Sequence, residues 1–237
     1  MILGEVHDNP EHHRRQAELI TRLAPSAVAF EMLTPEQAAV ANGTDRRDAT
    51  LAEALGWAES GWPAWSLYEP VFQAAGDATI YGMALPRDDV SRAVKDGAAT
   101  VFGPGADRFG LTAALPPAQQ AEREAHQQAV HCNALPEFLL PGMVQAQRLR
   151  DAVFARTALK ALEDTSGPVV VITGTGHART DWGMPVALKH AAPAVIVVSV
   201  GQLEESPEDE APFDQWLVSE PAPREDPCEG FSMSGDS

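Results

Sequence analysis

The sequence has few cysteines and little positive charge, and both shortages exclude classes of function. Cys132 and Cys228 are its only cysteines, which is too few for a disulfide framework. Its 17 Lys and Arg residues face 34 Asp and Glu residues, giving a formal net charge of -17. We therefore expect no nucleic-acid partner, because no phosphate-neutralising surface is evident. No apolar run is long enough to cross a bilayer, so no transmembrane segment is expected either.

A leader segment is also missing, since neither a basic region nor an apolar run precedes Gly4. As it stands, the sequence predicts a cytoplasmic protein. The first predicted strand begins at Ile2, however, and strands normally have about five or six residues. We therefore leave open that Met1 is not the natural start and that a longer precursor carried a targeting segment.

The opening stretch, from Ile2 to His13, packs three histidines and three carboxylates into twelve residues. It is typical of a short apolar strand that turns into a helix, with Asp8 or Asn9 as the cap and Pro10 in the first turn. His12 and His13 then lie where the helix dipole disfavours imidazolium, and neutral imidazoles suit ligation or general-base chemistry. The alternative is a polar cap with solvated histidines. The density of these side chains favours a site.

Three more chemically capable side chains follow predicted strands. Glu31 ends the apolar run 26–33, and Arg87 follows the run 78–84, where it is placed to meet an anion. His177 follows a run of four β-branched residues, 169–172, which is a strong signal for a buried strand. Because ligands of parallel α/β sheets bind beyond the carboxyl ends of the strands, we expect these residues to join Glu5 and His7 at one edge.

Alternating strands and helices predict an α/β fold with a mainly parallel sheet, helices on both faces and a helical insertion or lid. We assign residues 1–203 to a single domain whose lid spans about 95–165. Residues 204–237 are acidic and rich in proline, so we expect most of this tail to be loosely ordered.

Four motifs together resemble the ChaN-like family: the turn 4–13, the element 84–87, the helix segment 143–151 and Gly174-Thr175-Gly176-His177. The resemblance covers roughly residues 2–200. It implies a bacterial haem-binding protein of iron or haem uptake, a homodimer, and a place in the cell envelope. The family is similar to a wider superfamily with Tiki-type metalloproteases and erythromycin esterases.

The resemblance also implies tyrosine as the iron ligand, and this chain has only two tyrosines. His126 and His131 are the fallback ligands, and Phe102, Phe109, Leu111 and Phe138 are expected to supply an apolar wall. The residues expected to bind haem are His12, His13, Arg87, Tyr68, Tyr81, His126, His131 and Arg179.

Haem alone needs an apolar slot and one or two axial ligands, not several carboxylates and histidines at strand ends. Those groups suit metal-assisted hydrolysis or general-base chemistry. A hydrolase acting on a small molecule is therefore the alternative to a haem carrier. Its catalytic residues would be Glu5, His7, Glu31 and His177, and a divalent metal would be held by His7 and His177.

Overall fold

The computed structural model describes residues 1–207, 209–226 and 228. The chain forms two units. Unit 1 comprises Met1–Ala84 and Val153–Ala222, and unit 2 comprises Leu85–Ala152 with residues of Pro223–Ser237. Among the described residues, no helix is long and apolar enough to span a membrane.

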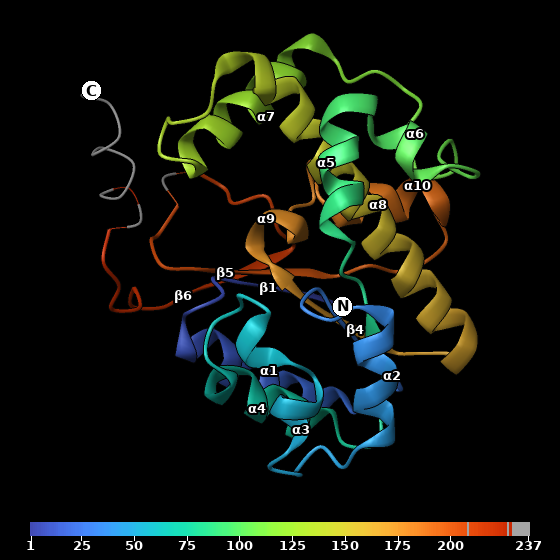
Figure 1. Cartoon of the computed structure of the whole chain (residues 1–237), viewed down its shortest axis with the longest axis vertical. Coiled ribbons are helices and arrows are strands. Elements are labelled where there is room, and N and C mark those ends of the chain that lie inside the picture. The colour runs from blue at the N-terminus through green and yellow to red at the C-terminus, as the bar shows by residue number, and fades with distance from the viewer. Residues whose placement is uncertain (208, 227, 229–237) are drawn as a thin grey trace. The chain divides into compact units, whose positions relative to one another are not determined.

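Unit 1 is built on a six-stranded sheet with the order β3-β2-β4-β1-β5-β6 (Figure 1). Every neighbouring pair is parallel. The predicted α/β fold with a mainly parallel sheet is thus confirmed. The strands are β1 (Ile2–Glu5), β2 (Ala27–Phe30), β3 (Thr79–Gly82), β4 (Val169–Gly174), β5 (Ser199–Leu203) and β6 (Gln215–Val218).

Helices cover both faces of this sheet. Those wholly in unit 1 are α1 (Pro10–Leu23), α2 (Pro35–Gly43), α3 (Leu51–Ala54), η1 (Trp57–Glu59), α4 (Trp65–Ala75), α9 (Thr175–Ala178) and α10 (Met184–Ala191). Figure 1 shows α1, α3 and α4 together on one side of the sheet.

Alternation along the strands decides which face each apolar side chain joins. Leu3, Phe30 and Ile172 pack in the core cluster that includes Ile20 of α1 and Phe72 of α4. Their chain neighbours point the other way, because successive strand side chains alternate between faces. On that second face a cavity of about 150 Å³ is lined by strand, α8 and α10 residues: Ile2, Val169, Val171, Ala158, Leu159, Leu162 and Leu188.

Side-chain caps fix where the first two long helices begin. Asn9 caps α1, and its side chain accepts a hydrogen bond from the Glu11 N–H. Thr34 caps α2 in a reciprocal pair with Gln37. Both helices have proline in the first turn, where the missing N–H costs nothing. The predicted helix starts are confirmed, with Asn9 as the cap of the first.

In its described residues, unit 2 is helical. It contains α5 (Arg87–Asp96), α6 (Ala98–Phe102), α7 (Pro117–Val130), η2 (Glu137–Leu139) and the first half of α8 (Leu140–Thr165). Of the predicted apolar wall, Phe102, Phe109 and Leu111 are buried, while Phe138 is 81% exposed. Cys132 and Cys228 form a disulfide within this unit.

Two strands differ from the sequence-based expectation. The predicted last strand, 194–200, begins only at Ser199, because a turn closed by the Val195 N–H and the Ala192 carbonyl precedes it. The acidic tail also contributes more structure than expected. β6 pairs with β5, and Phe213 is 9% exposed against Gly201. Residues 215–218 of the tail thus form a strand, and loose order for most of the tail stays a prediction.

Close backbone packing makes Gly82 a sensitive position. A Cβ there would lie 2.1 Å from the Thr34 carbonyl oxygen. We expect Gly82→Ala to lower the free energy of unfolding by about 1–3 kcal/mol, as overpacking does. Gly43 is the matched control, because a Cβ there meets nothing within 4 Å and Ala in a helix is better than Gly by up to about 1 kcal/mol. Urea unfolding of both variants tests this, and an unaffected Gly82→Ala would contradict it.

Candidate functional site

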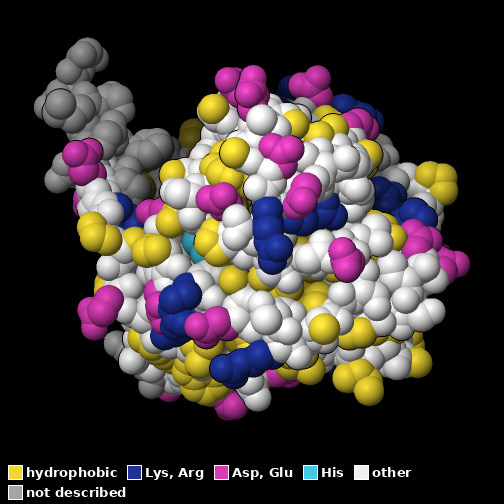
Figure 2. Space-filling model, turned by 90° about the horizontal axis from the view of Figure 1, so that it is seen from below, with side chains coloured by type: hydrophobic (Ala, Val, Ile, Leu, Met, Phe, Trp, Pro, Cys, Tyr) yellow, Lys and Arg dark blue, Asp and Glu magenta, His cyan; other side chains and the backbone are white. Residues whose placement is uncertain are grey.

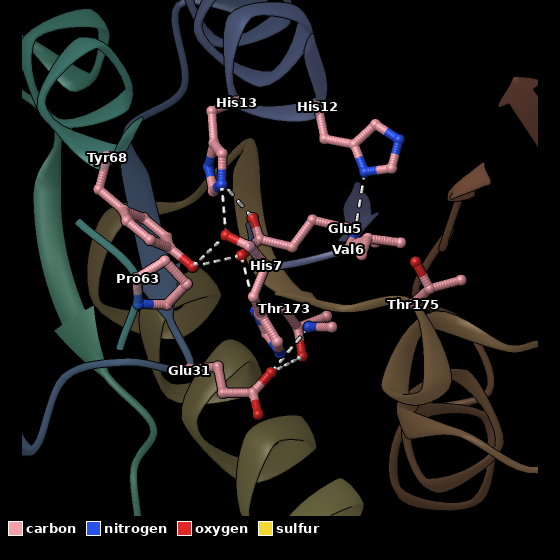
Figure 3. Close-up of polar contacts among 12 residues, drawn as sticks. Glu5, Val6, His7, His12, His13, Glu31, Pro63, Tyr68, Thr173 and Thr175 are labelled. Carbon is pink, nitrogen blue, oxygen red and sulfur yellow. Dashed lines mark hydrogen bonds and ion pairs between the residues drawn. The ribbon is translucent and has the colours of Figure 1, made fainter. Parts of the chain in front are cut away.

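A buried carboxylate, Glu5 at the end of β1, organises the first half of the site. Its side chain accepts three hydrogen bonds: from the Tyr68 hydroxyl at 2.7 Å, from His7 Nδ1 at 2.8 Å and from Gln16 Nε2 at 2.7 Å (Figure 3). Glu5 is only 2% exposed. Burying a charge is costly unless it is paired and hydrogen-bonded, and these three donors meet that requirement.

A second buried carboxylate, Glu31, lies just beyond β2. Its Oε2 atom accepts hydrogen bonds from Thr173 Oγ1 at 2.6 Å and from the Gly174 N–H at 2.8 Å. Its Oε1 atom lies 3.7 Å from His177 Nε2. The His177 ring packs edge-on against Phe154, with the ring centroids 4.9 Å apart. Strand β4 thus holds this carboxylate, and the turn after β4 brings a histidine to it.

The imidazole of His7 lies between the two carboxylates (Figure 3). Its Nδ1 atom contacts Glu5, while a Cβ on Gly174 would lie 2.9 Å from its Nε2 atom and 3.7 Å from Glu31 Oε2. Gly174 is therefore a position where only glycine leaves room for the ring. The His7 side chain is 33% exposed, and Trp62 packs against its ring edge-on at 4.9 Å. A histidine oriented by a carboxylate in this way can move a proton to or from a bound molecule.

The next two histidines stabilise the turn. His12 Nδ1 accepts a hydrogen bond from the Val6 N–H at 2.9 Å, so a neutral ring carries its proton on Nε2 and donates it to Ser219 Oγ at 2.9 Å. His13 Nε2 donates to the His7 carbonyl at 2.9 Å. Both side chains are buried, and the other ring nitrogen of His13, Nδ1, lies 3.6 Å from Glu5 Oε2. Their role in haem binding stays a prediction.

The buried state of His12 makes stability depend on pH. Burial lowers the pKa of His12 below its ordinary value of 6.5. The unfolded chain then binds more protons than the folded one as the pH falls below 6.5, so we expect the free energy of unfolding to decrease there. Urea unfolding at a series of pH values should show this loss, and His12→Gln should show a shallower one. Equal pH dependence of the two proteins would contradict the assignment.

Both tyrosines predicted to bind haem have carboxylate partners in unit 1, and their part in haem binding stays a prediction. Tyr68 is fully buried, and burial together with the Glu5 charge raises its pKa. Tyr81 donates a hydrogen bond to Asp164 at 2.9 Å, and partial burial and this carboxylate raise its pKa to about 12. Tyrosine binds iron as the phenolate, and these surroundings disfavour the phenolate of both.

The remaining predicted residues are outside this network. Arg179 is paired with Asp181 at 2.6 Å, and its guanidinium lies 3.6 Å from the centre of the Trp182 ring. Arg87, His126 and His131 belong to unit 2, where Arg87 is exposed at the start of α5. Their part in ligand binding stays a prediction.

A divalent metal at His7 and His177 is not supported. Within the described residues, no group of three or more His, Cys, Asp or Glu side chains is arranged to hold a metal ion.

The face of the molecule shown in Figure 2 has acidic and basic side chains side by side.

Two members of the network were missed in the sequence. Gln16 and Thr173 each hydrogen-bond a buried carboxylate. Gln16 lies three residues after His13 on the helix. Helical spacing places these two residues on one face, so it could have identified Gln16 as a residue of the site. Thr173 looked like one more β-branched residue of a strand, and nothing local marked its hydroxyl as a partner of Glu31.

The fold and the site define a class: a parallel α/β unit whose central strand ends in Gly-Glu-Val-His, with a second carboxylate and histidine at the same edge of the sheet. Residues 1–188 match the family model described as "Haem-binding uptake, Tiki superfamily, ChaN", and the chain belongs to this family. No curated protein matches the chain.

One solved structure supports the fold, and two others are more weakly similar. The structure of ChaN of Campylobacter jejuni, described as showing cofacial haem binding, has a TM-score of 0.67 at 20% identity, over 92% of this chain and 86% of that chain. An erythromycin esterase in its open conformation has a TM-score of 0.44 at 14% identity, over 99% of this chain and 79% of that one. A Bacillus cereus protein has a TM-score of 0.39 at 12% identity, over 82% and 62%.

Proposed function

We propose that this protein binds haem and takes part in haem or iron uptake. The observation that carries the proposal is the family match over residues 1–188. The fold it shares with the Campylobacter jejuni ChaN structure supports the proposal, since cofacial haem binding is described for that protein. We further propose a homodimer, which would bring two haems together.

Haem supplies an iron that needs one or two axial ligands and a porphyrin that needs apolar surface. Since Tyr68 is fully buried and Tyr81 donates its hydroxyl proton to Asp164, an imidazole is the ligand type that we propose for the iron. The disulfide between Cys132 and Cys228 supports a place in an oxidising compartment, where disulfides persist. That favours the envelope location implied by the family resemblance over the cytoplasmic one.

Titration of the purified protein with haemin tests the proposal. We expect a saturable Soret band with one haem per chain, and a light-scattering mass of two chains in the loaded form. Absorbance that rises linearly, as for free haemin in buffer, would overturn haem binding. A single-chain mass with bound haem would overturn only the dimer.

The second candidate function is hydrolysis, and the placement of His7 between Glu5 and Glu31 favours it. Glu5 orients the ring through Nδ1, and the opposite ring nitrogen can accept a proton from a water molecule. We expect any turnover of p-nitrophenyl esters to be lost in His7→Ala. It should be retained in His190→Ala, because His190 lies exposed at the end of α10. Wild-type turnover no faster than buffer would remove this candidate.

A further inference from the structure

We propose that His131, at the end of α7 in unit 2, is the axial ligand that holds the haem iron. This inference rests on the proposed haem binding. The His131 ring nitrogen Nδ1 lies 2.8 Å from the Gln127 carbonyl oxygen. A carbonyl only accepts, so Nδ1 carries the proton, and in the neutral ring Nε2 carries the lone pair that a metal requires. A hydrogen bond from the other ring nitrogen is the usual way in which proteins orient a metal-binding histidine.

Four of the other histidines, all in unit 1, suit this role less well. His12 and His13 are buried, with ring nitrogens committed to Ser219 and to the His7 carbonyl. His7 and His177 face the buried carboxylates Glu5 and Glu31. His131 is half-buried at the end of α7, so its side chain is not enclosed as those of His12 and His13 are.

Exposed apolar side chains occur in the same segment as His131, and haem requires apolar surface as well as a ligand. Of the described residues of unit 2, Val130 and Phe138 are the large apolar side chains that are most exposed, at 56% and 81%. Two hydrogen bonds fold this segment back on itself, from the Asn133 N–H to the Gln128 carbonyl and from Gln128 Nε2 to the Leu135 carbonyl. The disulfide at Cys132 adds a covalent link one residue after the proposed ligand.

Four variants test the assignment by haemin titration and by the absorption and EPR spectra of the ferric complex. We expect His131→Ala to weaken haemin binding by at least about tenfold and to change the ferric spectra. Added imidazole should restore the wild-type spectrum, because it replaces the lost ligand. Phe138→Ala should weaken binding several-fold with unchanged spectra. His190→Ala, at the C-terminal turn of α10, is the matched control and should bind like the wild type. Tyr81→Phe should do the same.

The outcomes separate this inference from the proposed function. Unchanged haemin affinity and spectra in His131→Ala would overturn the ligand assignment while haem binding stands. Loss of the wild-type spectrum in Tyr81→Phe instead would assign the iron to tyrosine. A wild-type protein that does not bind haemin would overturn both. The urea midpoint of His131→Ala, expected within error of the wild type, excludes unfolding as the cause of weaker binding.

Discussion

Replacing Glu5 by alanine is expected to lower the free energy of unfolding by about 3–5 kcal/mol, the range for removing one partner of a buried charged pair. The reason is that three donors depend on this one carboxylate: the Tyr68 hydroxyl, His7 Nδ1 and Gln16 Nε2. Without it the Tyr68 hydroxyl and Gln16 Nε2 lose their buried carboxylate acceptor, and each unsatisfied buried group costs about 1–3 kcal/mol, while the partly exposed His7 ring can turn to water. Glu5→Ala would therefore remove the negative charge of Glu5 and also the three hydrogen bonds that hold the neighbouring side chains in place.

Two further variants make the Glu5 experiment specific. Tyr68→Phe removes a single hydrogen bond to a charged group and should cost about 1.5–3 kcal/mol. Glu163→Ala removes an exposed carboxylate of α8 and should change stability by no more than about 0.5 kcal/mol. Urea unfolding followed by tryptophan fluorescence measures all three. If Glu5→Ala were as stable as Glu163→Ala, Glu5 would not be the organising residue of this site.

Breaking the Cys132–Cys228 disulfide is expected to have the other large effect. The two residues are 96 positions apart, and a cross-link that closes a loop of about 100 residues stabilises by up to about 4.7 kcal/mol through the lost freedom of the unfolded chain. We expect Cys228→Ser to lower the urea midpoint of unfolding strongly, with unfolding followed by the circular dichroism of the helices. Dithiothreitol should have the same effect on the wild type.

The double variant Cys132→Ser/Cys228→Ser is the control for the disulfide. Its unfolding should match that of Cys228→Ser and should not respond to dithiothreitol. Thiol titration of the denatured wild type gives an independent reading, because paired cysteines do not react until they are reduced. Two reactive thiols in the untreated protein would contradict the pairing.

The parts of the fold that the sequence predicted correctly are those with strong local signals. The β-branched run before Thr173 has few alternatives to a buried strand, and Asn9 and Thr34 cap helices through atoms two or three residues away. Parallel pairing then brings the ends of β1, β2 and β4 to one edge, so Glu5, His7, Glu31 and His177 were within reach of sequence reasoning. Their chemical roles stay predictions.

The features that were missed depend on distant partners. Tyr68 looks like an ordinary core residue of α4 until the fold brings it to Glu5, 63 residues earlier. Strand β6 follows an acidic stretch, and all four of its residues are exposed, so no alternation of buried and exposed positions marked it. The spacing of Cys132 and Cys228 gave no reason to pair them, because a cross-link over such a distance is visible only in the folded chain.

The central position of β1 has a consequence for biosynthesis. Ile2 pairs with Val171 and with Ser199, which are made long after it. At about 5–20 residues per second, roughly 10–40 s pass before the ribosome supplies the second of these partners. The Asn9 side chain, which caps α1 locally, gains another partner later still, since its Nδ2 atom donates a hydrogen bond to the Glu220 carbonyl. Strand β1 thus stays unpaired on the nascent chain until β4 and β5 have been made, and it reaches its final place only with them.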